Sequence, residues 1–139
     1  MKFTCTKTNF NNGINIALKA VPGKTTMPIL ECVVIEAKGD MVKLTTNDMQ
    51  LGIETKIPAE IEQDGIILVN AKMISEIVRR LPDDDVNFEV DENNNILLFC
   101  GKSKFNIPGI PHDEFPMLPK IEAVYLKGND KTDHFLNFR

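Results

Sequence analysis

Apolar and polar residues alternate along most of the chain, and at two places a helical spacing interrupts this alternation. Residues 3–6 alternate, which predicts a short strand. The next apolar residues recur every three or four positions and so share one face of a helix: Phe10, Ile14, Ala17, Leu18 and Val21. We expect Thr8 or Asn9 to cap the start of this helix and Pro22-Gly23 to end it.

A stretch rich in strand-forming residues follows the first helix. Residues 30–37, 41–46 and 49–57 are apolar or alternating, and turn residues at 39–40 and 47–48 separate them. Pro58 should end the third strand, because proline cannot donate a backbone hydrogen bond to a sheet. These spacings predict an antiparallel meander.

The same order of elements then begins again. Residues 65–69 read as a strand, Asn70 is a good helix cap, and Pro82 ends a second helical stripe. Three more strands are predicted at 86–90, 96–100 and 102–107. The chain therefore reads strand–helix–three strands twice, which indicates an internal repeat. We predict an α+β fold of two β-α-β-β-β repeats, with antiparallel sheets and both helices on one face.

The composition is that of one globular domain. The chain has 139 residues and a net charge of −4. It contains no apolar run long enough for a membrane helix and no signal-peptide core at its start, so we expect a cytoplasmic protein without a membrane partner. Cys5, Cys32 and Cys100 are widely spaced, and the two histidines lack ligand spacing. We therefore expect buried thiols, no metal and no cofactor.

The distribution of charge changes this picture. Acidic residues concentrate in the predicted strands and turns, whereas residues 7–24 contain three lysines and no carboxylate. The second helix carries three cations, Lys72, Arg79 and Arg80, against Glu76 alone. Each helix taken singly reads equally well as an ordinary solvated face. Two such faces on repeated units favour a positive strip that attracts phosphates without reading bases.

A series of short motifs resembles the first domain of bacterial sliding clamps, the DNA polymerase III beta subunits. They are Met1-Lys2-Phe3-Thr4, Met27-Pro28-Ile29-Leu30, residues 44–48, Asn70-Ala71-Lys72, Arg80-Leu81-Pro82, residues 101–105 and residues 113–116. No single motif is specific, but their order and spacing over residues 1–119 are. The resemblance implies the DNA clamp fold and a head-to-tail ring of two three-domain subunits around double-stranded DNA. It also implies a non-catalytic processivity subunit that tethers the polymerase to its template.

The resemblance also implies roles for individual residues. It places Lys24, Lys72 and Arg79 at basic DNA contacts, and we expect Lys19 and Arg80 to extend that strip. Phe105 and Ile107 match the strand that packs against the neighbouring subunit, and Lys102 and Lys104 would flank this contact. Plain core positions are the alternative for Phe105 and Ile107. We expect both side chains on or next to an exposed sheet edge.

The resemblance covers a domain at residues 1–119, and residues 120–139 form a divergent tail. A complete clamp would be about three times as long, and its pocket for polymerase and clamp-loader peptides lies largely on domains outside this chain. The tail reads as a truncated or frameshifted end, or as a docked extension.

Two other functions compete with the clamp domain. A metal-dependent nuclease would need carboxylates such as residues 83–85 or 91–92 to converge on one cleft, whereas solvated acidic turns are the ordinary reading of both runs. A stand-alone interaction or regulatory module derived from a clamp domain is the other alternative.

Overall fold

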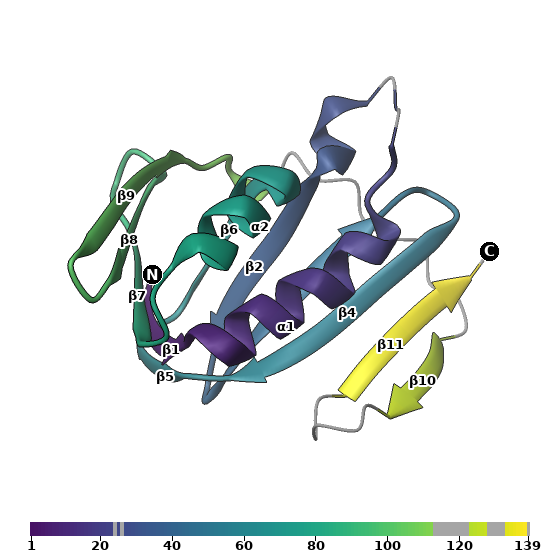
Figure 1. Ribbon diagram of the computed structural model, residues 1–139. Coiled ribbons are helices and arrows are strands. Elements are labelled where there is room, and N and C mark those ends of the chain that lie inside the picture. The colour runs from purple at the N-terminus through teal and green to yellow at the C-terminus, as the bar shows by residue number, and fades with distance from the viewer. Residues whose placement is uncertain (24, 26, 113–122, 128–132, 139) are drawn as a thin grey trace.

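Two antiparallel sheets and two helices make up the molecule (Figure 1). The computed structural model describes residues 1–23, 25, 27–112, 123–127 and 133–138, the last two segments as backbone only. The five-stranded sheet has the order β5 (Glu60–Gln63), β1 (Lys2–Thr6), β7 (Asp85–Val90), β8 (Asn95–Cys100), β9 (Ser103–Pro108). The six-stranded sheet has the order β10 (Ala123–Lys127), β11 (Asp133–Phe138), β4 (Leu51–Pro58), β3 (Met41–Asn47), β2 (Cys32–Lys38), β6 (Gly65–Asn70).

The two sequence repeats exchange their first strands. β1 precedes helix α1 (Lys7–Ala17) but pairs with β7 of the second repeat, with Phe3 opposite Phe88. In the same way β6 precedes helix α2 (Ala71–Arg80) but pairs with β2 of the first repeat. Each sheet thus combines the three consecutive strands of one repeat with the first strand of the other, while β5 extends the five-stranded sheet and β10 and β11 extend the six-stranded sheet. The predicted α+β fold of two β-α-β-β-β units is confirmed, and the exchange is what joins the units into one domain.

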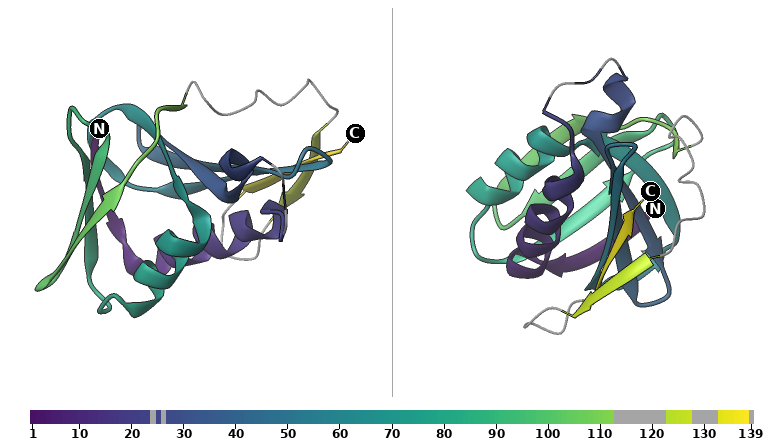
Figure 2. Two further views of the ribbon diagram at one scale, coloured as in Figure 1. Left: turned by 90° about the horizontal axis from the view of Figure 1, so that it is seen from above. Right: turned by 90° about the vertical axis from the view of Figure 1, so that its right-hand side faces the viewer.

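Both helices lie side by side along the open side between the two sheets (Figure 2). α2 begins as expected, because the Asn70 side chain accepts a hydrogen bond from the Met73 N–H at 2.9 Å. The predicted start of α1 at Thr8 or Asn9 is wrong. The Thr6 hydroxyl accepts from the Asn9 N–H at 3.1 Å, so the last residue of β1 is itself the cap. α1 ends at Ala17, and a 3₁₀ turn, Leu18–Ala20, follows it.

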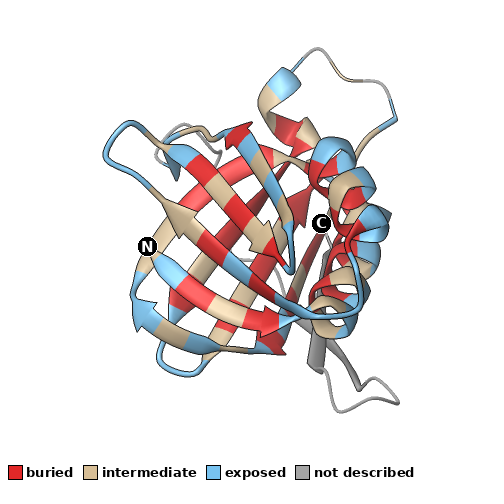
Figure 3. Ribbon diagram, turned by 60° about the vertical axis from the view of Figure 1, so that its left-hand side comes forward, coloured by how far each residue is buried: buried red, intermediate tan, exposed pale blue. Residues whose placement is uncertain are grey.

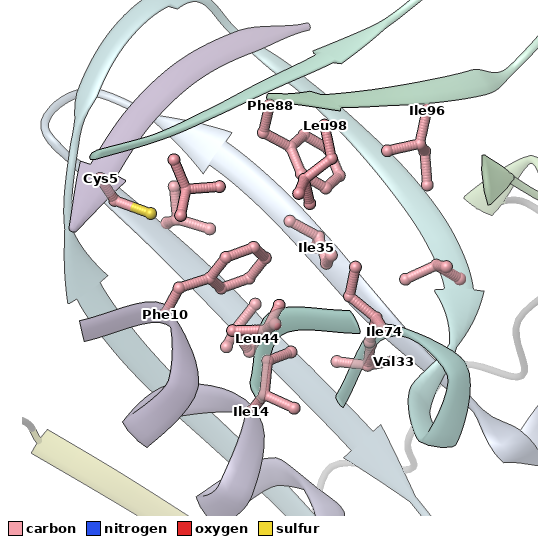
Figure 4. Packing of buried hydrophobic residues seen from close by; sticks show 14 of the residues in the cluster. Cys5, Phe10, Ile14, Val33, Ile35, Leu44, Ile74, Phe88, Ile96 and Leu98 are labelled. Atoms are coloured by element: carbon pink, nitrogen blue, oxygen red, sulfur yellow. The ribbon is translucent and has the colours of Figure 1, made fainter. Parts of the chain in front are cut away.

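The core fills the space enclosed by the inner faces of the sheets and the two helices (Figures 3 and 4). At its centre the rings of Phe3 and Phe88 stack with centroids 4.8 Å apart. The Phe10 ring of α1 meets both edge-on, at 6.3 and 6.1 Å. These three side chains are at most 1% exposed. The three rings therefore connect the exchanged strand β1 with its neighbour β7 and with helix α1.

Gly13 explains how α1 comes so close to the six-stranded sheet. A Cβ atom at this position would lie 2.8 Å from both Ile57 Cγ2 and Leu44 Cδ1. Glycine costs a helix about 1 kcal/mol relative to alanine. Here the close contact between α1 and strands β3 and β4 offsets that cost, as expected for a helix whose stability comes from docking.

One additional strand and two strand boundaries differ from the prediction. Pro58 ends β4 as predicted, but the chain runs on through Ala59 into an unexpected strand, β5, which pairs with β1 in the other sheet. A 3₁₀ turn, Pro28–Glu31, delays the start of β2 to Cys32. β4 starts at Leu51 because Asp48 Oδ1 accepts from the Leu51 N–H at 2.6 Å and closes a turn, where Met49 has a φ of 74°.

Part of the segment expected to diverge forms a hairpin on the six-stranded sheet. The backbone of β11 pairs antiparallel with β4, and β10 pairs with the outer side of β11. Residues 120–122, 128–132 and 139 of this segment lie outside the described residues.

Candidate nucleic-acid interface

The two helices and the 3₁₀ turn after α1 carry cations that make no ion pair among the described residues. α1 and its 3₁₀ extension expose a row of Thr8, Asn12, Asn15 and Lys19. α2 exposes Lys72, Met73, Glu76, Arg79 and Arg80. Together these helices hold five lysines and arginines and one carboxylate, in a chain of net charge −4. The two helical segments that the sequence shows to be basic therefore also lie next to each other in the folded chain.

Among the described residues, no carboxylate forms an ion pair with the cations on the helices. In the described part of the chain the ion pairs belong to lysines on the outer sheet faces. Lys2 lies 3.3 Å from Glu89, and Lys43 lies 3.2 Å from Glu36. No such pair involves Lys19, Lys72, Arg79 or Arg80. Their charges are available to a polyanion, whereas the lysines of the sheets are partly compensated.

The helices run antiparallel, and this divides the basic residues into two groups. The Lys7 ammonium, at the start of α1, donates a hydrogen bond to the Arg79 carbonyl at the end of α2, at 3.3 Å. One group is therefore Lys7, Arg79 and Arg80. The start of α2 lies toward the end of α1 (Figure 1), so Lys72 in the first turn of α2 and Lys19 in the 3₁₀ turn after α1 belong to the other end of the helix pair. About 10 Å of helix separates Lys72 from Arg79, since each residue rises 1.5 Å.

Sequence reasoning placed four of these residues on the helix faces and missed the role of Lys7. The structure exposes Lys19, Lys72, Arg79 and Arg80 as expected. The fifth expected contact, Lys24, lies outside the described residues. Lys7 was overlooked because the helix was expected to begin after Thr8 or Asn9, which would have left Lys7 in a linker. The signal that finds it is the cap at Thr6, which makes Lys7 the first helical residue.

The residues of the second expected site lie on β9 or directly before it. β9 is the last strand of its sheet, so its outer backbone edge has no partner strand among the described residues. Lys102, Lys104 and Asn106 are exposed. Ile107, however, is 2% exposed and belongs to the core, and Phe105 is half-buried against the same core. The apolar side of the strand faces inward because β9 pairs with β8 so that Ile107 lies opposite the buried Ile96 and Phe105 opposite the buried Leu98.

The two acidic runs, residues 83–85 and 91–92, lie in or next to turns. Asp91 Oδ1 accepts from the N–H groups of Asn93 and Asn95, at 2.8 and 2.9 Å. The hydrogen bond from the Asn95 backbone is the main cause that holds the pKa of Asp91 below its usual value. Among the described side chains, those of residues 1–23, 25 and 27–112, no three His, Cys, Asp or Glu are grouped as a metal site would require. Residues 83–85 follow α2 as an exposed loop and the start of β7.

The cysteines are buried free thiols, as predicted. Burial raises the pKa of the Cys5 thiol to about 12, and burial is also the main cause that raises the pKa values of Cys32 and Cys100. A thiol of this kind is a poor nucleophile, because the thiolate is the reactive form.

A pocket of about 420 Å³ opens beside the start of α1, and its lining has the wrong charge for phosphate. Asp40, Glu60 and Asp85 contribute carboxylates, and Thr4, Thr6 and Asn9 contribute neutral polar groups. The surface suited to a nucleic acid is therefore the exposed side of the helices. No helix in the described ranges is long and apolar enough to cross a membrane.

Comparison with known proteins identifies the family. Residues 1–119 match the family described as DNA polymerase III beta subunit, N-terminal domain. The chain belongs to this family. The beta sliding clamp of Bacillus subtilis (strain 168) is 40% identical over 130 residues, which cover 88% of this chain and 34% of that protein. The beta sliding clamp of Synechocystis is 33% identical and is covered to the same extent, 34%.

Solved structures of beta subunits have the same fold. One from Eubacterium rectale, titled a DNA polymerase III beta subunit, superposes with a TM-score of 0.84 at 48% identity, over 91% of this chain and 36% of that one. The beta subunit from the DNA polymerase of Streptococcus pyogenes gives 0.84 at 30% identity, with the same coverage of both chains. This chain thus spans about a third of the length of these beta subunits.

Proposed function

We propose that this chain acts as a DNA sliding clamp domain that contacts duplex DNA through the exposed sides of α1 and α2. The observation that carries the proposal is the group of unpaired cations on these two helices, in an acidic chain of the beta subunit family. Arginine and lysine bind phosphates without base information, so the contacts are independent of sequence. The domain is a processivity element and carries out no chemical step.

Weak contacts suit this function. A ring that encloses DNA is retained by topology, so its inner surface needs only enough positive charge to favour the duplex and must let it slide. The neutral row of Thr8, Asn12 and Asn15 lies between basic residues at either end of the helix pair. The carboxylates of the sheets, such as Glu36, Glu54 and Glu89, repel DNA from the outer faces. The charge distribution thereby selects one side of the domain for the duplex.

The free edge of β9 is the surface that we propose for contact with a neighbouring clamp domain in a head-to-tail ring. Backbone groups along Ser103–Pro108 would extend the sheet, and Lys102 and Lys104 would flank the contact. Phe105, half-buried, supplies apolar area at this edge, while Ile107 supports the strand from within. On this proposal residues 1–119 are the clamp unit, residues 120–139 are an extension, and DNA polymerase III and a clamp loader are partners of the complete cytoplasmic ring.

The experiment for the proposed function is a titration of the chain with two duplexes of unrelated sequence, at several salt concentrations. A single domain encircles nothing, so we expect a Kd near or weaker than about 10⁻⁴ to 10⁻⁶ M, equal for both sequences. The logarithm of the affinity should fall with the logarithm of the salt concentration, with a slope of about −0.9 per phosphate contacted. Tight, salt-insensitive or sequence-selective binding would contradict the proposal and favour an independent interaction module.

A further inference from the structure

Lys7 stands at the junction of the two helices that face the DNA. Its ammonium donates to the Arg79 carbonyl at 3.3 Å, and its own N–H donates to the Asp84 carbonyl at 3.2 Å. Lys7, the first residue of α1, is thus hydrogen-bonded to the last turn of α2, 72 positions away in the chain, and to Asp84, shortly after that helix. These two bonds fix the last turn of α2 relative to α1.

The end of α2 needs such a partner. The last four carbonyls of a helix have no N–H donor within the helix, so their partners must come from elsewhere. α2 has no glycine cap: it ends at Arg80, and the residue after it, Leu81, is extended and donates its N–H to the Val78 carbonyl. The Lys7 ammonium donates a hydrogen bond to the Arg79 carbonyl and places a positive charge at the negative end of the α2 dipole. Without this bond the final turn, which carries Arg79 and Arg80, is free to fray.

A frayed turn would change which anions the arginines meet. Asp83, Asp84 and Asp85 follow directly, so a released last turn would bring Arg79 and Arg80 within reach of these carboxylates. The arginines make no ion pair with them in the structure, where α2 stops at Arg80 and β7 begins at Asp85. The arginines remain exposed and available to an external phosphate.

We propose that Lys7 is a positioning residue for DNA binding, which acts by holding the last turn of α2 so that Arg79 and Arg80 face the duplex. This inference rests on the proposed function of the helix faces. It assigns to Lys7 an indirect role through the Arg79 backbone, distinct from that of Lys19 or Lys72, whose side chains extend freely into solvent.

A double-mutant cycle distinguishes positioning from direct contact. The variants Lys7→Gln, Arg79→Gln and their combination are titrated with a short duplex at low salt, with Lys38→Gln as a control of equal charge change on a sheet. We expect Lys7→Gln and Arg79→Gln each to weaken binding about two- to fivefold. Each should reduce the salt slope by about 0.9, and the double variant should be no worse than either single variant. Lys7→Arg should restore binding.

Amide hydrogen exchange without DNA gives an independent readout. Exchange at Arg79 and Arg80 should accelerate in Lys7→Gln and not in Lys7→Arg, while exchange in the middle of α2 stays unchanged. If the effects of Lys7→Gln and Arg79→Gln multiply, or if Lys7→Gln alone has none, the positioning role is overturned and the proposed function stands. If Arg79→Gln and Lys72→Gln also leave binding unchanged, both proposals fail.

Discussion

Phe88→Ala should destabilise the chain by about 3–5 kcal/mol, the usual cost of removing a fully buried aromatic ring. The Phe88 ring stacks on Phe3 at 4.8 Å and meets Phe10 edge-on at 6.1 Å. Its loss would leave a cavity where the exchanged strand β1, strand β7 and helix α1 meet. A domain of this size has about 5–15 kcal/mol of total stability, so the variant would lose a large fraction of it. Urea denaturation followed by circular dichroism measures the change.

Phe99→Ala is the matched control for this prediction. Phe99 lies opposite Asn87 on the neighbouring strand β8, but it points to the outer face, where it is half-buried and its ring lies 5.5 Å from the Lys104 ammonium. We expect this substitution to cost about 1 kcal/mol or less. Equal losses from the two substitutions would show that the core is not centred on the aromatic cluster.

The paired substitution Lys72→Glu/Arg79→Glu should weaken duplex binding by more than about tenfold at low salt and remove most of the salt dependence. It replaces one exposed cation in each basic group by an anion, so two attractions become repulsions. Stability should change by about 0.5 kcal/mol or less, because both side chains are exposed and make no ion pair in the described structure. Titration with the same duplex measures the loss.

Lys38→Glu/Lys56→Glu is the control with the same change in net charge. Both lysines are exposed at strands of the six-stranded sheet, away from the helices. We expect this variant to weaken binding by about twofold or less, through the general increase in negative charge alone. A similar loss in both variants would mean that net charge, rather than the helix faces, governs the interaction with DNA.

The sequence was sufficient for the local features of the fold. The apolar stripe of α2, its cap at Asn70 and the order of strands in each repeat all depend on residues close together in the chain, so they could be predicted from the sequence. The change of sheet after Pro58 was not predictable in this way. β5 follows β4 after a single residue, and only its pairing with β1 places it in the other sheet. Such pairing depends on contacts between distant parts of the chain.

The same distinction holds for the two sites. Exposure of Lys72 and Arg79 followed from helical spacing, whereas the contact of Lys7 with Arg79 depends on how two distant helices pack. The alternation in β9 correctly separated Phe105 and Ile107 from the lysines. It did not say which side of the strand faces the core, and Ile107 proved to be buried. That choice is made by the pairing of β9 with β8, which aligns Ile107 with the buried Ile96.

Chemical-shift mapping of the isotope-labelled chain with a short duplex tests the central claim most directly. Amide signals at the exposed positions of α1 and α2, among them Asn12, Asn15, Lys72 and Arg79, should move on addition of DNA and return as salt is raised. Signals of outer-face residues such as Lys43 and Phe99 should stay in place. If the largest shifts instead map to the outer face of either sheet, or to the acidic pocket beside Asp40 and Glu60, the helices are not the DNA-binding surface.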